Sequence, residues 1–432
     1  MDRSLWAVLT GTFTLRFSTA LTGTMLAFYL AHIRDYQPQA SIVSPETVGL
    51  FAATFFVAEL ILSPIFGVLS DRFGHHRVML WGPIFGAVAV VLTAATSDLV
   101  ILGGTRFLEG SSTAASVPSI LGYIAIVTAG NEAMRGRAAS RFEGATLAGL
   151  GLGIIVALPL FKLLGPSAFL LNAGFYGVSL LIYAIGVKDP SGERAAVAGP
   201  HVSFRRYLGL ISHSHVLLLA PTWIAVNASL GLWMSQSIFQ LSQSDPRFPD
   251  QWLLQGFEVP EIVVGMIVIA IVFGVGILWW GNRFDRFRRT SIIGLGIFGG
   301  LGLIVAAGIV NHAAFHAGDN PLVGGLIAIA VLVVVIGLFA LAGATPAAVG
   351  LLADVSEQFP TDRGAIMGLY SVFLAIGQIT GSLLGGVAAH WRGMDGLLVA
   401  TGALLLVALV PLSRLRRVEH YLGGPTGPAA LD

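Results

Sequence analysis

The sequence contains no cysteine and little charge. Without cysteine, the 432 residues can form neither a disulfide framework nor a thiol site. Charged residues make up 11% of the chain, whereas a soluble domain carries about 25%. The formal net charge of +1 gives no reason to expect a nucleic-acid partner. A chain this long, with 55% hydrophobic residues, is therefore predicted to be solvated by lipid.

The sequence also lacks the usual signs of an enzyme. The histidines near predicted turns, His75, His76, His213 and His215, have no acidic residues at the spacing of a metal-ligand motif. No glycine-rich nucleotide-binding loop is present, so transport driven by ATP within this chain is not expected. We therefore expect no enzymatic activity, no metal and no cofactor.

Long apolar runs account for most of the chain. A membrane-spanning helix needs roughly 20 apolar residues, and the sequence contains twelve such runs. Turn chemistry marks the breaks, as at Ser44-Pro45-Glu46 and Asn320-Pro321. The first run shows no small-residue cleavage site, so we expect it to be a retained helix. The sequence thus predicts an all-α membrane protein with spans at residues 6–31, 46–70, 78–97, 100–129, 141–162, 166–187, 213–240, 257–281, 290–311, 321–353, 364–389 and 395–412.

A basic segment between the second and third runs, residues 67–77, has a degraded copy in the second half of the chain. Asp71 and Arg72 recur as Asp285 and Arg286 at an offset of 214 residues, about half of the 432. The chain is therefore predicted to consist of two related halves. We expect an N-terminal six-helix bundle at 1–187, a linker with a short amphipathic helix at 188–212, a C-terminal six-helix bundle at 213–412 and a tail at 413–432.

The pattern Gly-x-x-x-Asp-Arg-x-Gly that ends at Gly74 resembles the signature loop of the major facilitator superfamily of secondary transporters. The resemblance implies two pseudo-symmetric six-helix bundles around a central site, and a cytoplasmic gate. In that gate Asp71 would accept hydrogen bonds near residues 362–364 and pair with Arg77. The alternative is a basic turn that only sets topology. The residues assigned to the gate are Gly67, Asp71, Arg72, Gly74, Arg77, Asp285 and Arg286; in the second copy Arg288 replaces the last glycine.

The distribution of basic residues predicts the orientation. With both termini inside, 18 of the 24 Lys and Arg residues lie in cytoplasmic segments and four lie in outer segments. Cytoplasmic loops carry an excess of these residues in membrane proteins. We therefore expect a multi-pass protein of the cell membrane, inner or plasma, with both termini in the cytoplasm, and we expect it to be a monomer in the lipid bilayer.

Among the ionisable residues in apolar runs, four stand out, all in the first half: Arg16, Glu59, Arg106 and Glu109. A charge at the bilayer centre costs about 2.5–3.5 kcal/mol on insertion scales, so such residues face protein or water. For Arg16 the alternatives are a substrate or coupling contact and a buried structural ion pair. For Glu59 they are a proton or substrate site and a hydrogen-bond partner for a neighbouring helix.

The fourth run contains the strongest candidate. Arg106-Phe107-Leu108-Glu109-Gly110 resembles the Arg-x-x-Gln-Gly motif of the superfamily, with Glu109 replacing the amide. The resemblance implies a role of Arg106 in proton coupling. Arg106, Glu109 and Thr113 share one helix face, and the first two can pair across one turn. A carboxylate next to a cation but buried is pulled toward both protonation states. A static ion pair is the alternative.

The second half offers uncharged polar residues instead. We assign them to the wall of a substrate cavity, which suits a weakly polar or amphipathic ligand; for the tryptophans, an anchor at the membrane interface is the alternative. The assigned residues are Trp223, Asn227, Trp233, Gln236 and Gln378.

Together these features predict a secondary active transporter of a small amphipathic or organic solute, coupled to protons, that works by alternating access. It is most similar to proton-coupled drug-efflux members. The Gly-Pro-x-x-Gly-Gly pattern of antiporters is missing, since Pro159 stands alone in its run, so the direction of transport stays open. The alternatives are a uniporter, a lipid or lysolipid translocator, and a membrane receptor that binds without transport.

Overall fold

The computed structural model describes residues 3–188, 216–283, 286–318, 320–357 and 363–418. These residues form long α-helices, which confirms the all-α prediction. The chain divides into two compact units, one of residues 1–201 with 259–263 and one of residues 202–258 with 264–432. The predicted linker lies outside the described residues except for Lys188, and the predicted tail is described only as far as Val418.

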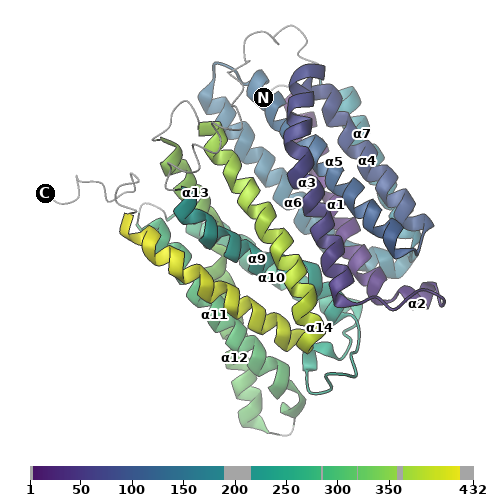
Figure 1. The fold of residues 1–432 in the computed structure, drawn as a ribbon, viewed down its shortest axis with the longest axis vertical. Helices are drawn as coiled ribbons and strands as arrows, with labels where there is room; N and C mark the ends of the chain where they lie inside the picture. The colour runs from purple at the N-terminus through teal and green to yellow at the C-terminus, as the bar shows by residue number, and fades with distance from the viewer. Residues whose placement is uncertain (1–2, 189–215, 284–285, 319, 358–362, 419–432) are drawn as a thin grey trace, which may run out of the picture. The chain divides into compact units, whose positions relative to one another are not determined.

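The first unit contains six long helices (Figure 1). Helix α1 packs against α6 and α7, while α5 packs against α3 and α4, and α4 also contacts α7. Side chains expected at helix starts cap two of the helices: Ser44 accepts a hydrogen bond from Thr47 N, and Asp98 accepts from Val100 N and Ile101 N. The elements of this unit are α1 (Arg3–Ala31), the short α2 (Ile33–Tyr36), α3 (Pro45–Phe73), α4 (His75–Ala95), α5 (Leu99–Val127), α6 (Glu132–Leu164) and α7 (Ser167–Gly186).

The predicted turn at 67–77 is wrong in extent. Helix α3 continues through Asp71 and Arg72 to Phe73, and α4 begins at His75, so Gly74 alone makes the turn. Its φ of 98° lies in the region that favours glycine, and its N–H donates to Ser70 O at 2.9 Å. The whole segment was predicted as a loop because its charges and glycines are typical of one, but a single glycine suffices to reverse the chain.

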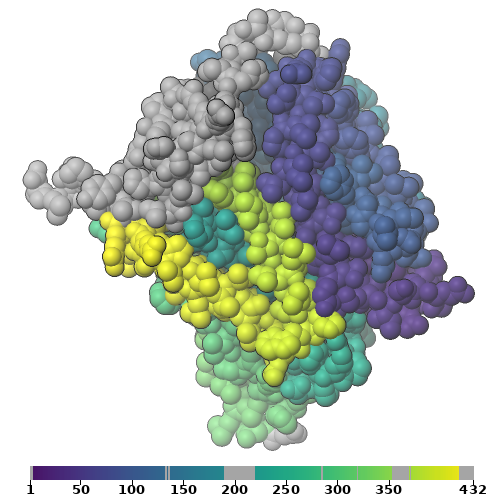
Figure 2. All heavy atoms as spheres, in the orientation of Figure 1, coloured from purple at the N-terminus to yellow at the C-terminus, as the bar shows by residue number. Residues whose placement is uncertain are grey.

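The second unit holds the remaining elements, apart from residues 259–263 (Figure 1). The eleventh and twelfth predicted spans are the two limbs of α14, which reverses at Arg392 and Gly393, where Gly393 has a φ of 56°. Figure 2 shows both limbs, in lime and yellow, with teal atoms of α9 between them. The tenth predicted span is divided at Gly343 into α12 and α13. The elements are α9 (Val216–Leu241), η1 (Trp252–Leu254), α10 (Val259–Gly281), α11 (Arg289–Ala313), η2 (Ala314–His316), α12 (Pro321–Ala342), α13 (Ala344–Glu357) and α14 (Arg363–Val418).

The loop from Ser242 to Glu258 is fixed to the second unit by hydrogen bonds. Gln251 is buried; its amide donates to Arg392 O at 3.0 Å and accepts from Asp395 N at 3.2 Å. Within the loop, burial of Asp245 opposes its ionisation, but hydrogen bonds and charge from Arg247 outweigh burial and lower the pKa of this carboxyl. The loop is therefore an ordered part of the unit.

Within the described residues, nine helices are long and apolar enough to cross a membrane. One of these stretches, residues 371–417, contains most of both limbs of α14. Helices α1 and α9, with 29 and 26 residues, also have the length of a span. The elements thus agree with the twelve predicted apolar runs, each displaced at its ends by at most a few turns.

Candidate functional site

The centre of the candidate site is an ion pair on α5. Arg106 and Glu109 lie three residues apart, and Arg106 Nη1 contacts Glu109 Oε2. Both side chains are inside the first unit: Arg106 is 9% exposed and Glu109 is 1% exposed. The guanidinium of Arg106 also lies over the Phe55 ring of α3, 5.0 Å from its centroid. A buried charge requires compensation of this kind, because an unpaired charge inside a protein costs several kcal/mol.

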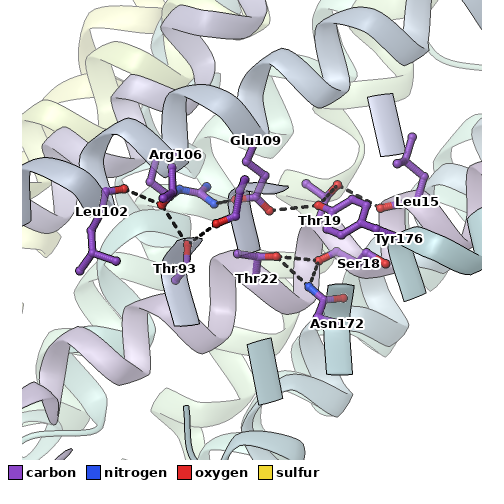
Figure 3. A network of polar contacts seen from close by, with 12 residues as sticks. Leu15, Ser18, Thr19, Thr22, Thr93, Leu102, Arg106, Glu109, Asn172 and Tyr176 are labelled. Carbon is purple, nitrogen blue, oxygen red and sulfur yellow. Dashed lines mark hydrogen bonds and ion pairs between the residues drawn. The ribbon is translucent and has the colours of Figure 1, made fainter. Parts of the chain in front are cut away.

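The second oxygen of Glu109 contacts another helix. Tyr176 on α7 donates its hydroxyl to Glu109 Oε1 at 3.2 Å, and the same hydroxyl lies 3.3 Å from Thr19 Oγ1 on α1 (Figure 3). One turn before Tyr176, Asn172 donates to Thr22 Oγ1 at 2.8 Å and to Ser18 O at 2.9 Å. The carboxylate therefore joins α5 to α7 directly, and to α1 through hydroxyl groups.

Close packing fixes this network in place. A Cβ atom at Gly86 of α4 would overlap the ring of Tyr176, so the glycine is what lets the tyrosine approach α4. On the other side, Arg106 Nη2 lies 4.0 Å from the Cβ position of Gly23 on α1. The backbone of four helices thus determines where the carboxylate of Glu109 and its partners lie.

A second group of charges lies on α1, α3 and α6. Arg16 is half-buried on α1, and its charge acts on Glu59 of α3 and on Glu143 of α6. Glu59 is half-buried, while Glu143 is exposed. Of the four predicted charged residues, Arg106 contacts Glu109, and Arg16 acts on Glu59 through its charge. Thr113 is buried one turn beyond Glu109 on the same helix.

The predicted gate residues occupy the junction of α3 and α4. Asp71 and Arg72 are exposed, and Asp71 Oδ1 lies 3.7 Å from His75 Nε2. His75 Nδ1 lies 3.1 Å from Ser70 Oγ, so this histidine connects the end of α3 to the start of α4. Arg77 N donates to Gly74 O in the first turn of α4, and the Cβ position of Gly67 is 3.8 Å from Pro118 of α5.

The rest of the gate prediction is described only in part. Asp285 lies outside the described residues, and so does Asp362, near which Asp71 was expected to bind. Arg286 is exposed, and its backbone N–H donates to Arg283 O at 3.0 Å. The role of these residues as a gate stays a prediction.

Of the five predicted cavity residues of the second unit, four are buried and Trp233 is half-buried. Asn227 donates to Trp223 O at 2.9 Å, and Trp233 Nε1 donates to Thr401 Oγ1 at 2.9 Å. Gln236 and Gln378 are 0% and 5% exposed. Close contacts with glycines join α9 to the first limb of α14, where these side chains lie. Their role as a substrate wall stays a prediction.

Sequence reasoning missed Tyr176, Asn172 and Glu143. The two residues of α7 stand in an apolar run of the sequence, and a tyrosine or asparagine there carries no charge to attract notice. Glu143 lies at the start of the predicted span 141–162, two residues after Arg141, and was not singled out. A signal was available for Asn172, because a buried amide in a membrane helix requires hydrogen-bond partners.

The chain is similar to known transport and resistance proteins. Multidrug resistance protein 1 of Bacillus subtilis is 25% identical over 347 residues, which cover 80% of this chain and 81% of that protein. The class C tetracycline resistance protein of Escherichia coli is 25% identical over 88% of this chain and 90% of its own. The human chromaffin granule amine transporter is 24% identical over 83% of this chain and 63% of its own.

Solved structures share the fold at much lower identity. A crystal structure of the nucleoside transporter NupG superposes with a TM-score of 0.69, covers 95% of this chain and 99% of its own, and is 13% identical. The model of the Major Facilitator Superfamily matches residues 8–314 and 244–429. The match extends over nearly the whole chain, and its relatives are multi-pass transporters of small molecules rather than enzymes. The chain belongs to the major facilitator superfamily.

Proposed function

We propose that this protein is a proton-coupled secondary transporter that exports small amphipathic organic molecules across the cell membrane. The observation that carries the proposal is the buried pair of Arg106 and Glu109. A carboxylate that is 1% exposed, paired with one cation and hydrogen-bonded to one tyrosine, can be neutralised by a proton, and Arg106 then keeps the Phe55 ring as a neighbour. Binding and release of that proton would then be linked to opening of the transporter to either side.

The printed names of the relatives support the direction and the substrate class. Two of them are called multidrug and tetracycline resistance proteins, which suits export of organic molecules. The buried polar residues assigned to the second unit are uncharged, so they suit a ligand with few charges of its own. We further propose the orientation with both termini in the cytoplasm and a monomer as the working unit.

Transport by the purified protein in liposomes tests the proposal. Tetracycline and the fluorescent cation ethidium serve as probes, and a pH gradient is imposed across the membrane. We expect the wild-type protein to accumulate at least one probe against its gradient, and a protonophore to abolish this. A lumenal pH dye should report proton movement when the probe is added.

The variant Glu109→Gln tests the assigned proton site. We expect it to lose accumulation while it still binds the probe, measured as a shift of its melting temperature. Asp35→Asn is the matched control, because Asp35 is an exposed acid of α2 outside the network. Accumulation by Glu109→Gln at the wild-type level would show that the proton binds elsewhere. Wild-type transport that is insensitive to the protonophore would favour a uniporter or a lipid translocator.

A further inference from the structure

The hydroxyl group of Tyr176 has one hydrogen and two acceptors. Glu109 Oε1 lies 3.2 Å away and Thr19 Oγ1 lies 3.3 Å away. A phenol donates a single hydrogen bond, so it cannot satisfy both oxygens at the same time. The ring itself cannot move to a different partner, because it is 0% exposed and lies against the backbone of Gly86. The freedom that remains is rotation of the hydroxyl hydrogen.

Thr19 can only accept in this contact. Its own hydroxyl hydrogen is donated to Leu15 O at 3.0 Å, one turn back on α1. Threonine has one hydroxyl hydrogen, so Thr19 Oγ1 has none left for Tyr176. The direction of the bond between Tyr176 and Thr19, when it forms, is therefore from the tyrosine to the threonine.

The protonation state of Glu109 decides between the two acceptors. An ionised carboxylate has only lone pairs to offer and is the stronger acceptor, so it takes the hydrogen of Tyr176. A protonated carboxyl has a hydrogen of its own, which it can donate to the oxygen of Tyr176. The tyrosine hydrogen is then free to turn to Thr19. Binding of one proton thus reverses one hydrogen bond and forms another on α1.

We propose that Tyr176 is a positioning residue that transmits the protonation state of Glu109 to helix α1. This inference rests on the proposed function, in which Glu109 binds the coupling proton. The proton binds on α5, the switch is the hydroxyl group on α7, and the response is a bond to α1, the helix that also carries Arg16. The chemistry needs no change in side-chain rotamer, and therefore no loss of packing.

Within the part of the chain that the structure describes, few other charged groups near Glu109 could transmit its protonation state to α1. Arg106 on α5 contacts the oxygen that Tyr176 does not. Helix α1 presents the neutral Thr19 and Thr22, and α3 presents the Phe55 ring to Arg106. Arg16 on α1 acts through its charge on Glu59 of α3 and Glu143 of α6, and these three residues form the second group.

A second tyrosine on the same helix provides an internal control. Tyr183 lies two turns after Tyr176, is also 0% exposed, and has its ring against Gly11 as Tyr176 has against Gly86. Its hydroxyl donates to Thr12 Oγ1 at 3.4 Å, and Thr12 in turn donates to Val8 O. The tyrosine, glycine and threonine of the two sets correspond, but only the set of Tyr176 includes an acid.

Infrared spectroscopy of the purified protein in liposomes, recorded over a series of pH values, tests the inference. The band of the protonated Glu109 carboxyl is identified as the one that Glu109→Gln removes, and its midpoint is followed. We expect Tyr176→Phe to move this midpoint to higher pH by about one unit, because the ionised form loses one hydrogen bond to a charged group. We expect Thr19→Val to move it to lower pH, because the protonated form loses the alternative acceptor.

The control variant and the opposite signs separate this role from a merely structural one. Tyr183→Phe should leave the midpoint unchanged. If Tyr176→Phe and Thr19→Val leave the midpoint where it is, or move it in the same direction, the inference is wrong although Glu109 still binds the proton. If no carboxyl band is lost in Glu109→Gln, the proton site itself is wrong and the inference falls with it. Thr19→Val gives an independent result should Tyr176→Phe fail to fold.

Discussion

At the scale of single residues, the first unit tolerates the two buried charges of α5 because each has partners of fixed geometry. Arg106 has a carboxylate on one side and the Phe55 ring on another, and Glu109 has a cation on one oxygen and a phenol on the other. Removing one partner of such a pair leaves an uncompensated buried charge, which costs more than removing both. The pair is therefore better tested as a pair than by single substitutions.

Stability measurements on two variants follow from this. We expect Arg106→Gln to destabilise the protein by about 3 kcal/mol, because Glu109 is left without its cation. Arg106→Gln combined with Glu109→Gln should regain most of the loss, since two neutral amides can hydrogen-bond to each other. Thermal unfolding in detergent at pH 7 measures both. A double variant that is as unstable as Arg106→Gln, or more so, would contradict the expectation.

Part of this site could be predicted from the sequence. Arg106 and Glu109 were found because charge in an apolar run is unusual and because three-residue spacing places both on one helix face. Their partners Tyr176 and Asn172 could not be found in this way. They come from a helix more than 60 residues away, and their distance from Glu109 and α1 depends on how tightly α7 packs on α1 and α4. Folding brings Tyr176 and Asn172 to these partners, and the pattern of residues in the sequence does not reveal it.

At the scale of helices, glycine determines which pairs can approach. Two glycines of α6, Gly149 and Gly153, lie against the backbone of α1: their Cβ positions are each 2.5 Å from a carbonyl oxygen, Phe13 O and Phe17 O. Two others on the same helix, Gly144 and Gly151, have nothing within 4 Å of theirs. The sequence shows four similar glycines, but only the packing distinguishes two that carry the contact from two that do not.

Substituting alanine at each glycine distinguishes the two classes. We expect Gly149→Ala and Gly153→Ala to destabilise the protein by about 1–3 kcal/mol, because the added methyl group forces α6 away from α1. Gly144→Ala and Gly151→Ala should be neutral or more stable by up to about 1 kcal/mol, because alanine favours the helix. Melting temperatures of the four variants in the same detergent measure the difference. Equal effects at all four positions would argue against close packing of α6 on α1.

The helices themselves were predicted well, and the connections less so. Apolar runs of about 20 residues predict a membrane helix, because that length spans the hydrocarbon core. The turn after α3 was predicted too long, because charged residues are typical of a loop. In the structure Gly74 alone reverses the chain. At the second copy, α10 ends at Gly281 and α11 begins at Arg289, so the connection there is longer. Arg288 stands where the glycine would be, and a positive φ would be strained there.

At the scale of the whole molecule, the two units differ in the charge of their candidate residues. Among the described residues, those assigned to the substrate wall of the second unit carry no charge, while the first unit contains Arg16, Glu59, Arg106 and Glu109 within its helices. We infer that the first unit carries the coupling and the second unit the substrate contacts. This division, like the two-bundle organisation and the orientation in the membrane, is a prediction that requires a measurement on the intact protein.

The lack of cysteine makes the orientation easy to measure. Because the native chain has no thiol, a single introduced cysteine is the only site for a maleimide reagent. Ser244 in the loop after α9 and Ser413 near the end of α14 are both exposed. If the excess of basic residues places the termini inside, Ser244→Cys should react with an impermeant maleimide in intact cells, and Ser413→Cys only after permeabilisation. The reverse pattern would invert the topology. The site on Glu109 would then bind its proton from the opposite side, and the proposed export would become uptake.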